Sequence, residues 1–317
     1  MVEPRRNVIL KDSTLREAMD TPGVSFSVTA RIEIARLLES AGVAEAEVVA
    51  PSRVIADLEI ARLIKAQGLG ITTSGLIYAH RDTFADEARE AVGVLDRVDL
   101  IMPLSERRQP SRFEDKVDRL LAAIDLASGL GLSMGVGFPH STQVAVERLV
   151  EISELSASRG AGRITIYDTN GSAEPFALRD LMTGVASAVE VPVFFHGHND
   201  LGLAVANSWA AVLAGAAGLD VTINGLGDRA GNASLEQLVL LLHLHGMETG
   251  VETAQLHRAS RLVERLSGVE VSKLAPVVGD FVFEHLSPGH FGVPGEFEAF
   301  DPKLIGRRRR VRRNQTH

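Results

Sequence analysis

The chain has 317 residues, of which 45% are hydrophobic and 23% charged, enough for one large barrel or two ordinary domains with a substantial core. It contains no cysteine, which excludes disulfides, thiolate metal sites and a cysteine nucleophile. Its net charge of −8 becomes −14 when the six arginines between 307 and 313 are set aside, and so acidic a body repels nucleic acid.

Short β-branched runs alternate with amphipathic helical stretches in eight successive units. The predicted strand and helix of each unit are, in chain order, 8–12 with 28–41, 46–50 with 53–67, 70–77 with 83–95, 98–104 with 113–130, 133–137 with 144–159, 164–168 with 175–189, 191–196 with 202–214, and 220–224 with 234–245. Eight consecutive βα units predict an α/β fold, a closed (β/α)8 TIM barrel. A dinucleotide-binding fold has little support, because no GxGxxG loop follows the first run.

We expect two parts, a TIM-barrel catalytic domain over 1–252 and a short C-terminal extension over 253–317. The extension begins with a predicted helix over 254–266 and continues as a Gly/Pro-rich segment with an arginine-rich tail. That tail could bind a polyanion or an acidic neighbouring subunit, or could be a solvated terminus. The polar N-terminus and the lack of a long apolar run predict a cytoplasmic protein with no membrane partner.

A barrel of this kind carries its chemistry at the C-terminal ends of its strands. His196 and His198 stand two residues apart at the end of the seventh run, so period-two alternation points both rings to one face. With a carboxylate from another strand they would form a three-ligand metal site with open positions. Glu17, after the first run, is the preferred third ligand, and Asp12 is the weaker candidate. The alternative is a pair of histidines satisfied by ordinary hydrogen bonds.

Three further polar residues near strand ends each have one possible functional role and one possible structural role. Arg16 could hold an enolate oxygen beside the metal, or form a salt bridge to Asp12 or Asp228. Asn232 could join the metal sphere through its amide oxygen or cap the last helix. Thr169 could bind a substrate carboxylate or make a turn hydrogen bond.

Three strings carry a family resemblance: DSTLRE after the first run, HGHNDLGLAVAN after the seventh and NGLGDRAGN after the eighth. Together they resemble the homocitrate, isopropylmalate and citramalate synthase family, whose barrel is shared with acyl-CoA lyases and 4-hydroxy-2-oxovalerate aldolases. The resemblance covers about 8–254, with further similarity in VGDFVFEHLSPGH and FEAFDPKLIG.

The resemblance implies a metal enzyme that joins an acyl-CoA to a 2-oxo acid. By it, Glu17, His196 and His198 bind a divalent cation (Mn, Mg, Zn or Co), with Asn232 beside it. Arg16 would polarise the 2-oxo group or steady the enolate, and Thr169 would hold a substrate carboxylate. His290 matches a histidine that assists deprotonation of acetyl-CoA. A homodimer is implied as well, with the C-terminal extension of one subunit lying over the site of the other.

The sequence also departs from the synthase pattern. Arg16 and Glu17 are followed by Ala-Met-Asp rather than Gly-Glu-Gln, which makes Asp20 a candidate substrate-binding residue. The fifth run ends in PHSTQ, so Gln143 replaces the arginine that would pair with a distal carboxylate, and 2-oxoglutarate is placed in doubt as the acceptor. His140 could bind substrate there or be a surface histidine. Phe297 stands where many synthases have a tyrosine. Because no regulatory domain follows, feedback inhibition of the leucine-pathway type is not expected.

The first hypothesis is therefore an acyltransferase that condenses acetyl-CoA or a related acyl-CoA with an unusual 2-oxo acid. The alternative is a metal-dependent aldolase or lyase, which Met19 favours and the absence of cysteine disfavours for the acyl-CoA lyases. A third interpretation is a metabolite-binding barrel that regulates a partner through its tail. Arg107 and Arg108 could meet an anionic group. The remaining histidines that we treat as structural are His80, His243, His245 and His257.

Overall fold

The computed structural model describes residues 6–104, 112–290 and 292–311. Eight parallel strands form a closed barrel in sequence order, and β1 pairs with β8 through Ile9 opposite Gly218. The strands are β1 Ile9–Asp12, β2 Glu45–Val49, β3 Thr72–Tyr78, β4 Arg97–Ile101, β5 Met134–Phe138, β6 Ile164–Asp168, β7 Val193–Gly197 and β8 Gly218–Val221. This confirms the predicted TIM barrel.

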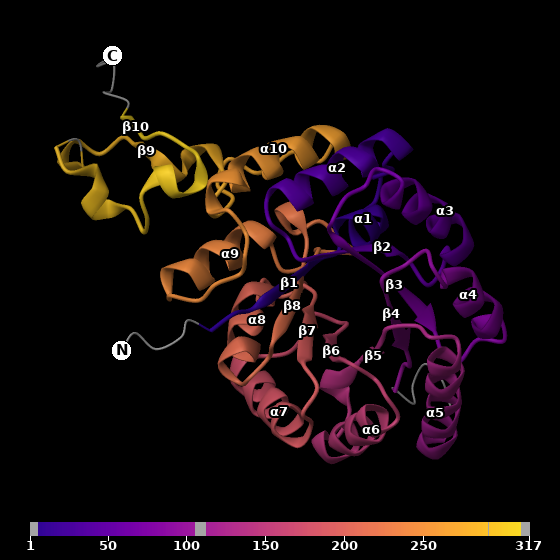
Figure 1. Cartoon of the computed structure of the whole chain (residues 1–317). Helices are drawn as coiled ribbons and strands as arrows, with labels where there is room; N and C mark the ends of the chain where they lie inside the picture. The colour runs from indigo at the N-terminus through magenta and orange to yellow at the C-terminus, as the bar shows by residue number, and fades with distance from the viewer. Residues whose placement is uncertain (1–5, 105–111, 291, 312–317) are drawn as a thin grey trace, which may run out of the picture.

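Helices surround the ring of strands on the outside (Figure 1). They are α2 Val28–Ser40, α3 Val54–Lys65, α4 Phe84–Ala91, α5 Phe113–Gly129, α6 Val146–Ser158, α7 Pro175–Ala188, α8 Ala204–Leu213 and α9 Leu235–Leu244. Each buries an apolar stripe against the barrel; on α2, Ile34 and Leu38 lie one helical turn apart and are almost fully buried. This burial pattern gives the fold two layers, an inner barrel of strands and an outer ring of helices.

Two predicted boundaries differ from the structure for local reasons. The helix predicted over 83–95 ends at Ala91, because Val92 leaves the helical region with ψ 127 and Gly93 follows with φ 72. The eighth strand was expected over 220–224 but lies at Gly218–Val221. Asn224 instead has φ 60 inside the 3₁₀ turn η3, Ile223–Gly225, which begins the polar loop above the barrel.

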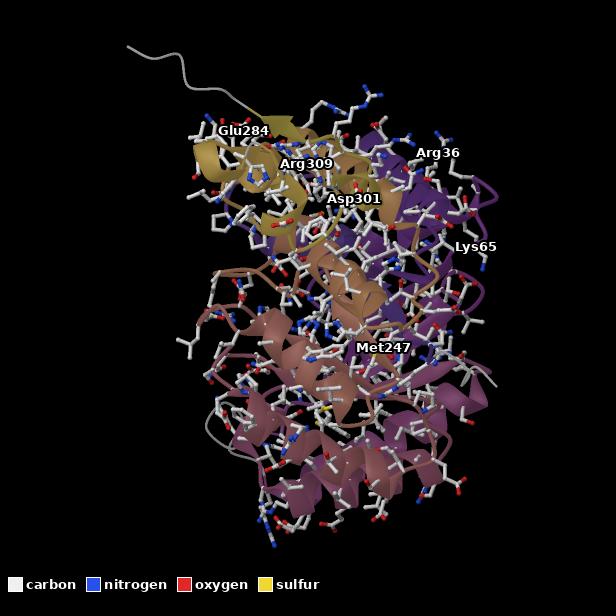
Figure 2. All side chains as sticks on the ribbon, turned by 90° about the vertical axis from the view of Figure 1, so that its left-hand side faces the viewer. Arg36, Lys65, Met247, Glu284, Asp301 and Arg309 are labelled. Atoms are coloured by element: carbon white, nitrogen blue, oxygen red, sulfur yellow. The ribbon has the colours of Figure 1, made fainter. Side chains whose placement is uncertain are left out.

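The C-terminal extension begins with α10 Leu256–Ser267, which packs against α2 and α9. Beyond it, the short strands β9 Glu284–His285 and β10 Arg310–Val311 pair in parallel. Figure 2 shows Arg309 and Glu284 together in this extension, at one end of the molecule. No helix among the described residues is both long and apolar enough to cross a membrane.

Two arginines of the basic segment hold this extension together. Arg307 donates a 2.6 Å hydrogen bond to the carbonyl oxygen of Gly279, and its guanidinium lies over the ring of Phe283. Arg309 donates to Glu298 over 2.7 Å. These two side chains therefore belong to the fold, and a purely solvated terminus is the wrong interpretation for them. Residues 312–317 lie outside the described residues.

Candidate metal centre and active site

The chain turns sharply after β1 into the four-residue helix α1, Thr14–Glu17, which aims two charged side chains into the barrel mouth. Asp12 accepts a 2.9 Å hydrogen bond from the backbone N–H of Thr14, and the Thr14 hydroxyl accepts one of 2.8 Å from the N–H of Ile223. These bonds tie the turn to the loop after β8. As a result, Arg16 and Glu17 are buried although they lie beyond the strand.

Glu17, His196 and His198 converge on one point, as the sequence predicts. One ligand atom from each lies within 4.8 Å of the others, and all three residues are buried. The two Nε2 atoms are 3.3 Å apart, and Nε2 of His198 is 3.7 Å from Oε1 of Glu17. One carboxylate oxygen and two imidazole nitrogens are a donor set that suits a divalent transition metal.

Both imidazoles are held in the form that binds a cation. Burial lowers the pKa of His196, and burial together with His196 lowers the pKa of His198 to about 2, so both rings are neutral at physiological pH. Asp220 lies 3.0 Å from Nδ1 of His196, which places the ring proton on Nδ1 and leaves the Nε2 lone pair facing the cluster. Asp220 thus orients His196 from the side of the ring that faces away from the other two residues of the cluster.

Asn232 lies beside the cluster, and its amide oxygen is available as a further metal ligand. Its Nδ2 is 3.1 Å from Nε2 of His196, and its Oδ1 is buried with no hydrogen-bond partner among the described residues. Helix α9 is capped by Ser234, whose hydroxyl accepts from Gln237, so the alternative of Asn232 as the cap is wrong. An orphaned amide oxygen next to a carboxylate and two neutral imidazoles fits a resident divalent cation.

Arg16 is fixed by carboxylates, but not by those expected. Its Nε donates to Oε1 of Glu47 over 2.6 Å, and it also pairs with Glu17. The suggested partners were wrong: Asp12 bonds to Thr14, and Asp228 pairs with Arg229. Burial pushes the pKa of Glu47 up, but Arg16 and Lys11 outweigh it and hold that pKa below its usual range. Arg16 is therefore a fixed cation at the barrel mouth.

A cavity of about 920 Å³ opens above the cluster. It is lined by seven of the residues singled out from the sequence: Arg16, Glu17, Asp20, His140, Thr169, His196 and His198. His140 is only 7% exposed, so it is not a surface histidine. Its backbone N–H donates 2.8 Å to the hydroxyl of Thr169, which joins the ends of β5 and β6 on one wall of the cavity.

The cavity also contains a basic side that sequence reasoning missed. His80 and Arg81, just after β3, line it together with Tyr78. The Arg81 guanidinium lies 4.4 Å from the Tyr78 ring centroid and donates 2.7 Å to the carbonyl of Pro51. Burial and then Arg81 lower the pKa of His80. On sequence alone His80 is treated as structural, and the structure places it in the lining of the cavity; its position just after a strand was the available signal.

His290 is not among the residues that line this cavity in the described part of the chain. It lies in the extension, where Nδ1 is 3.2 Å from Nδ1 of His285 and the ring stacks on Phe297 at 3.7 Å. Figure 1 shows this extension beside α10 rather than over the ring of strands. One copy of the chain therefore does not bring His290 to the cluster. Arg107 and Arg108 lie outside the described residues.

Beneath the cluster, the barrel interior contains a continuous chain of buried ion pairs. Its cations are Lys11, Arg16 and Arg163, and its carboxylates are Glu17, Glu45, Glu47, Asp99 and Asp220. With every carboxylate ionised, three positive and five negative charges leave a net charge of −2. A buried net charge is costly. One bound divalent cation would neutralise this interior, which is a second reason to assign a metal to the site.

Comparisons with known proteins agree with this geometry. A family model described as HMGL-like matches residues 7–263. The chain is 38% identical to the "Probable 2-isopropylmalate synthase" of Methanopyrus kandleri, over 95% of this chain and 61% of that one. It is 33% identical to Homocitrate synthase AksA of the same organism and 32% identical to Homocitrate synthase 1 of Nostoc sp., covering 78% and 82% of those proteins and 96% of this chain.

The similarity to the isopropylmalate synthases covers only part of their length, and solved structures share the fold. The chain spans about three fifths of the length of the isopropylmalate synthase relatives from Methanopyrus kandleri and Archaeoglobus fulgidus, 61% in each case. Among solved structures, the HMG-CoA lyase of Bacillus subtilis superposes with a TM-score of 0.75, over 88% of this chain and 98% of that one. The sequence identity is 20%, so this likeness concerns the fold.

Proposed function

The chain belongs to the HMGL-like family, and from that premise we propose that it is a divalent-metal-dependent acyltransferase. It condenses acetyl-CoA, or a related acyl-CoA, with a 2-oxo acid to give a 2-hydroxy acid of the alkylmalate or homocitrate kind. The single observation that carries the proposal is the buried convergence of Glu17, His196 and His198 beside Arg16. The relatives, which are named isopropylmalate and homocitrate synthases, supply the reaction class.

The residues of the site have distinct tasks in this reaction. Glu17, His196 and His198, with Asn232, would hold the cation, which when bound acts as a Lewis acid on the 2-oxo group. Arg16 is buried and fixed by Glu47, so its charge is already in place where negative charge develops on an oxygen. The Thr169 hydroxyl lines the same cavity and accepts from the N–H of His140, and it would donate its own proton to a substrate carboxylate.

The basic side of the cavity suggests which acceptor binds. His80 and Arg81 lie at the end of β3, and we propose that Arg81 holds a second, distal anionic group of the 2-oxo acid. Gln143 cannot perform this task, because it carries no charge. An arginine can pair with a carboxylate through two parallel N–H donors, which also fixes the orientation of the carboxylate. The acceptor would then be a dicarboxylic 2-oxo acid bound in an orientation that differs from the one expected around Gln143.

A second subunit is part of the proposal. His290 is the expected acid–base residue for the acyl-CoA methyl group, and it lies in the extension, away from the cavity of its own chain. The extension exposes Leu274, Leu286 and Phe297. At the barrel mouth, Phe176 and Leu201 are exposed as well. Apolar side chains on both surfaces support a homodimer in which each extension covers the other subunit's cavity; light scattering in solution tests the dimer.

Condensation and cleavage are separated by one assay. The protein is supplied with acetyl-CoA, Mn²⁺ and a panel of mono- and dicarboxylic 2-oxo acids, and free thiol is followed. CoA release that requires both metal and acceptor supports the synthase. The competing function is an aldolase or lyase, for which Met19 in the cavity lining is the specific observation. Pyruvate formation from 4-hydroxy-2-oxo acids, with no thiol release from any acceptor, would replace our proposal with that one.

A further inference from the structure

Lys11 lies at the centre of the barrel, directly below the cluster. It belongs to β1 and is fully buried. Its ammonium nitrogen is 2.7 Å from Oε2 of Glu47, 3.0 Å from Oδ2 of Asp220 and 3.2 Å from Oδ2 of Asp99. Burial alone would lower the pKa of Lys11, but the three carboxylates outweigh it and raise that pKa well above its usual value. One ammonium therefore ties together side chains from β1, β2, β4 and β8.

Two of these three carboxylates contact the active site on their other side. Oδ2 of Asp220 is shared between Lys11 and Nδ1 of His196, each at 3.0 Å. Glu47 uses Oε2 for Lys11 and Oε1 for Arg16, at 2.7 and 2.6 Å. The same buried cation is thus one carboxylate away from a metal ligand and one carboxylate away from the arginine at the barrel mouth.

We propose that Lys11 is a positioning residue that aligns His196 and Arg16 through Asp220 and Glu47. Without the ammonium, three buried carboxylates would face one another at the bottom of the site. Their repulsion in a region of low dielectric constant would turn Asp220 away from Nδ1 of His196. His196 would then lose the hydrogen bond that presents its Nε2 to the cation, and partners of this kind typically contribute about 10- to 100-fold to metal affinity.

Arg163 provides a matched comparison within the same interior. It is as deeply buried as Lys11 and pairs with Glu45 at 2.8 Å and Asp99 at 2.6 Å. Among the ion pairs described, neither of its partners contacts Glu17, His196 or Arg16. Loss of Arg163 disturbs the charge of the interior but leaves the two aligning carboxylates in place. A purely structural role for Lys11 predicts that both substitutions act alike.

The experiment measures Mn²⁺ affinity by calorimetry on metal-free protein whose folding is verified by circular dichroism. We expect Lys11→Met to weaken Mn²⁺ binding about 10- to 100-fold, and Arg163→Met to change it less than about threefold. Asp220→Asn should weaken binding like Lys11→Met. In the double variant the two losses should not multiply, because both act through one hydrogen bond. Unchanged affinity in Lys11→Met, or losses that multiply, would overturn the proposal.

A second comparison keeps the test informative if Lys11→Met alone does not fold, because its double variant leaves the net charge of the interior unchanged. Lys11→Met combined with Asp99→Asn removes one cation and one anion, whereas Asp99→Asn alone keeps Lys11 with Asp220 and Glu47. The double variant should bind Mn²⁺ at least tenfold more weakly than Asp99→Asn. If only Asp99→Asn folds, Lys11 is a structural residue and the proposal is wrong. A fall in kcat at saturating Mn²⁺ would report on Arg16. The affinity readout rests on the metal site of the proposed function, and the kcat readout rests on the proposed reaction as well, so metal binding decides the inference if no turnover exists.

Discussion

Gly227 passes so close to Asn232 that no side chain fits between them. A Cβ placed on Gly227 would overlap Oδ1 of Asn232, and it would also lie 3.1 Å from Cγ of Glu17. The loop after β8 therefore needs a glycine at this position to bring its backbone against the cluster. The glycine is required by the site and not by the backbone conformation, since Gly227 is not among the residues with positive φ.

We expect Gly227→Ala to displace the Asn232 amide, or Glu17, and to weaken Mn²⁺ binding at least about tenfold. Calorimetric titration of the metal-free protein measures this. Gly129→Ala is the control, because it adds the same methyl group in α5 with no atom within 4 Å. Equal Mn²⁺ affinity in the two variants would show that Asn232 and Glu17 do not form the metal site together.

Glu17→Gln keeps the shape of the side chain and removes the charge of the only carboxylate in the cluster. In the wild-type protein, Mn²⁺ at 100 times its Kd should stabilise the fold by about 2.7 kcal/mol, raising Tm by several degrees. In Glu17→Gln this rise should disappear together with turnover. Asp20→Asn, a carboxylate in the same cavity, should keep the rise in Tm. A thermal shift that survives in Glu17→Gln would remove Glu17 from the site.

Arg81→Met tests the basic side of the cavity. If Arg81 holds a distal carboxylate, the substitution should raise KM for dicarboxylic 2-oxo acids by about 10- to 100-fold, as expected for a lost hydrogen bond to a charged group. KM for pyruvate, which has no distal group, should stay the same. Initial rates with each acceptor give the two KM values, whose ratio is compared between Arg81→Met and the wild-type protein. A parallel rise for both would mean that Arg81 supports the loop instead, through its bond to Pro51.

Asp12 makes stability depend on pH in a direction opposite to that of most carboxylates. Burial raises its pKa from 3.8 to about 7. Between these values the unfolded state releases the proton while the folded state keeps it, so folding stability falls as pH rises from about 4 to 7 and is constant above 7. The loss amounts to roughly 4 kcal/mol at most. The Asp12→Asn variant has no titrating carboxyl group at this position, so it lacks this dependence of stability on pH.

The difference in Tm between Asp12→Asn and wild-type protein should therefore move in favour of the variant from pH 4 to pH 7, and stay flat from pH 7 to 9. Thermal unfolding at a series of pH values measures it, and subtracting the wild-type curve cancels the other titrating groups. A difference that is independent of pH would mean that Asp12 ionises in the fold as freely as in solution.

The barrel and most of its cluster were predictable because they depend on local patterns. Strand alternation alone put His196 and His198 on one face, and the order of the strands placed Glu17 near them. His80 and Arg81 were not recovered although they follow a predicted strand, because tertiary packing decides which residues after a strand face the cavity. Asn232 was named with two possible roles, and the structure rules out one of them because Ser234 caps α9.

The ionic interior escaped prediction for a different reason. Lys11, Glu47 and Asp99 stand in strands that each carry a second charged residue, Asp12, Glu45 and Arg97 respectively. A single sequence does not show which of these charged positions meet. Lys11 on β1 contacts Asp99 on β4, and these strands are not neighbours in the ring. Such a contact passes through the middle of the barrel, so only closure of the whole sheet creates it.

A barrel centred on charges also restricts what protein engineers can do with this scaffold. In a barrel whose interior is filled by aliphatic side chains, volume-conserving exchanges among those side chains usually cost little stability. Here a single replacement leaves an uncompensated ion in the middle of the molecule, so useful libraries must change Lys11, Asp99, Arg163 and their partners in matched sets. The outer helices, which bury apolar stripes against the barrel, remain the simpler place to begin.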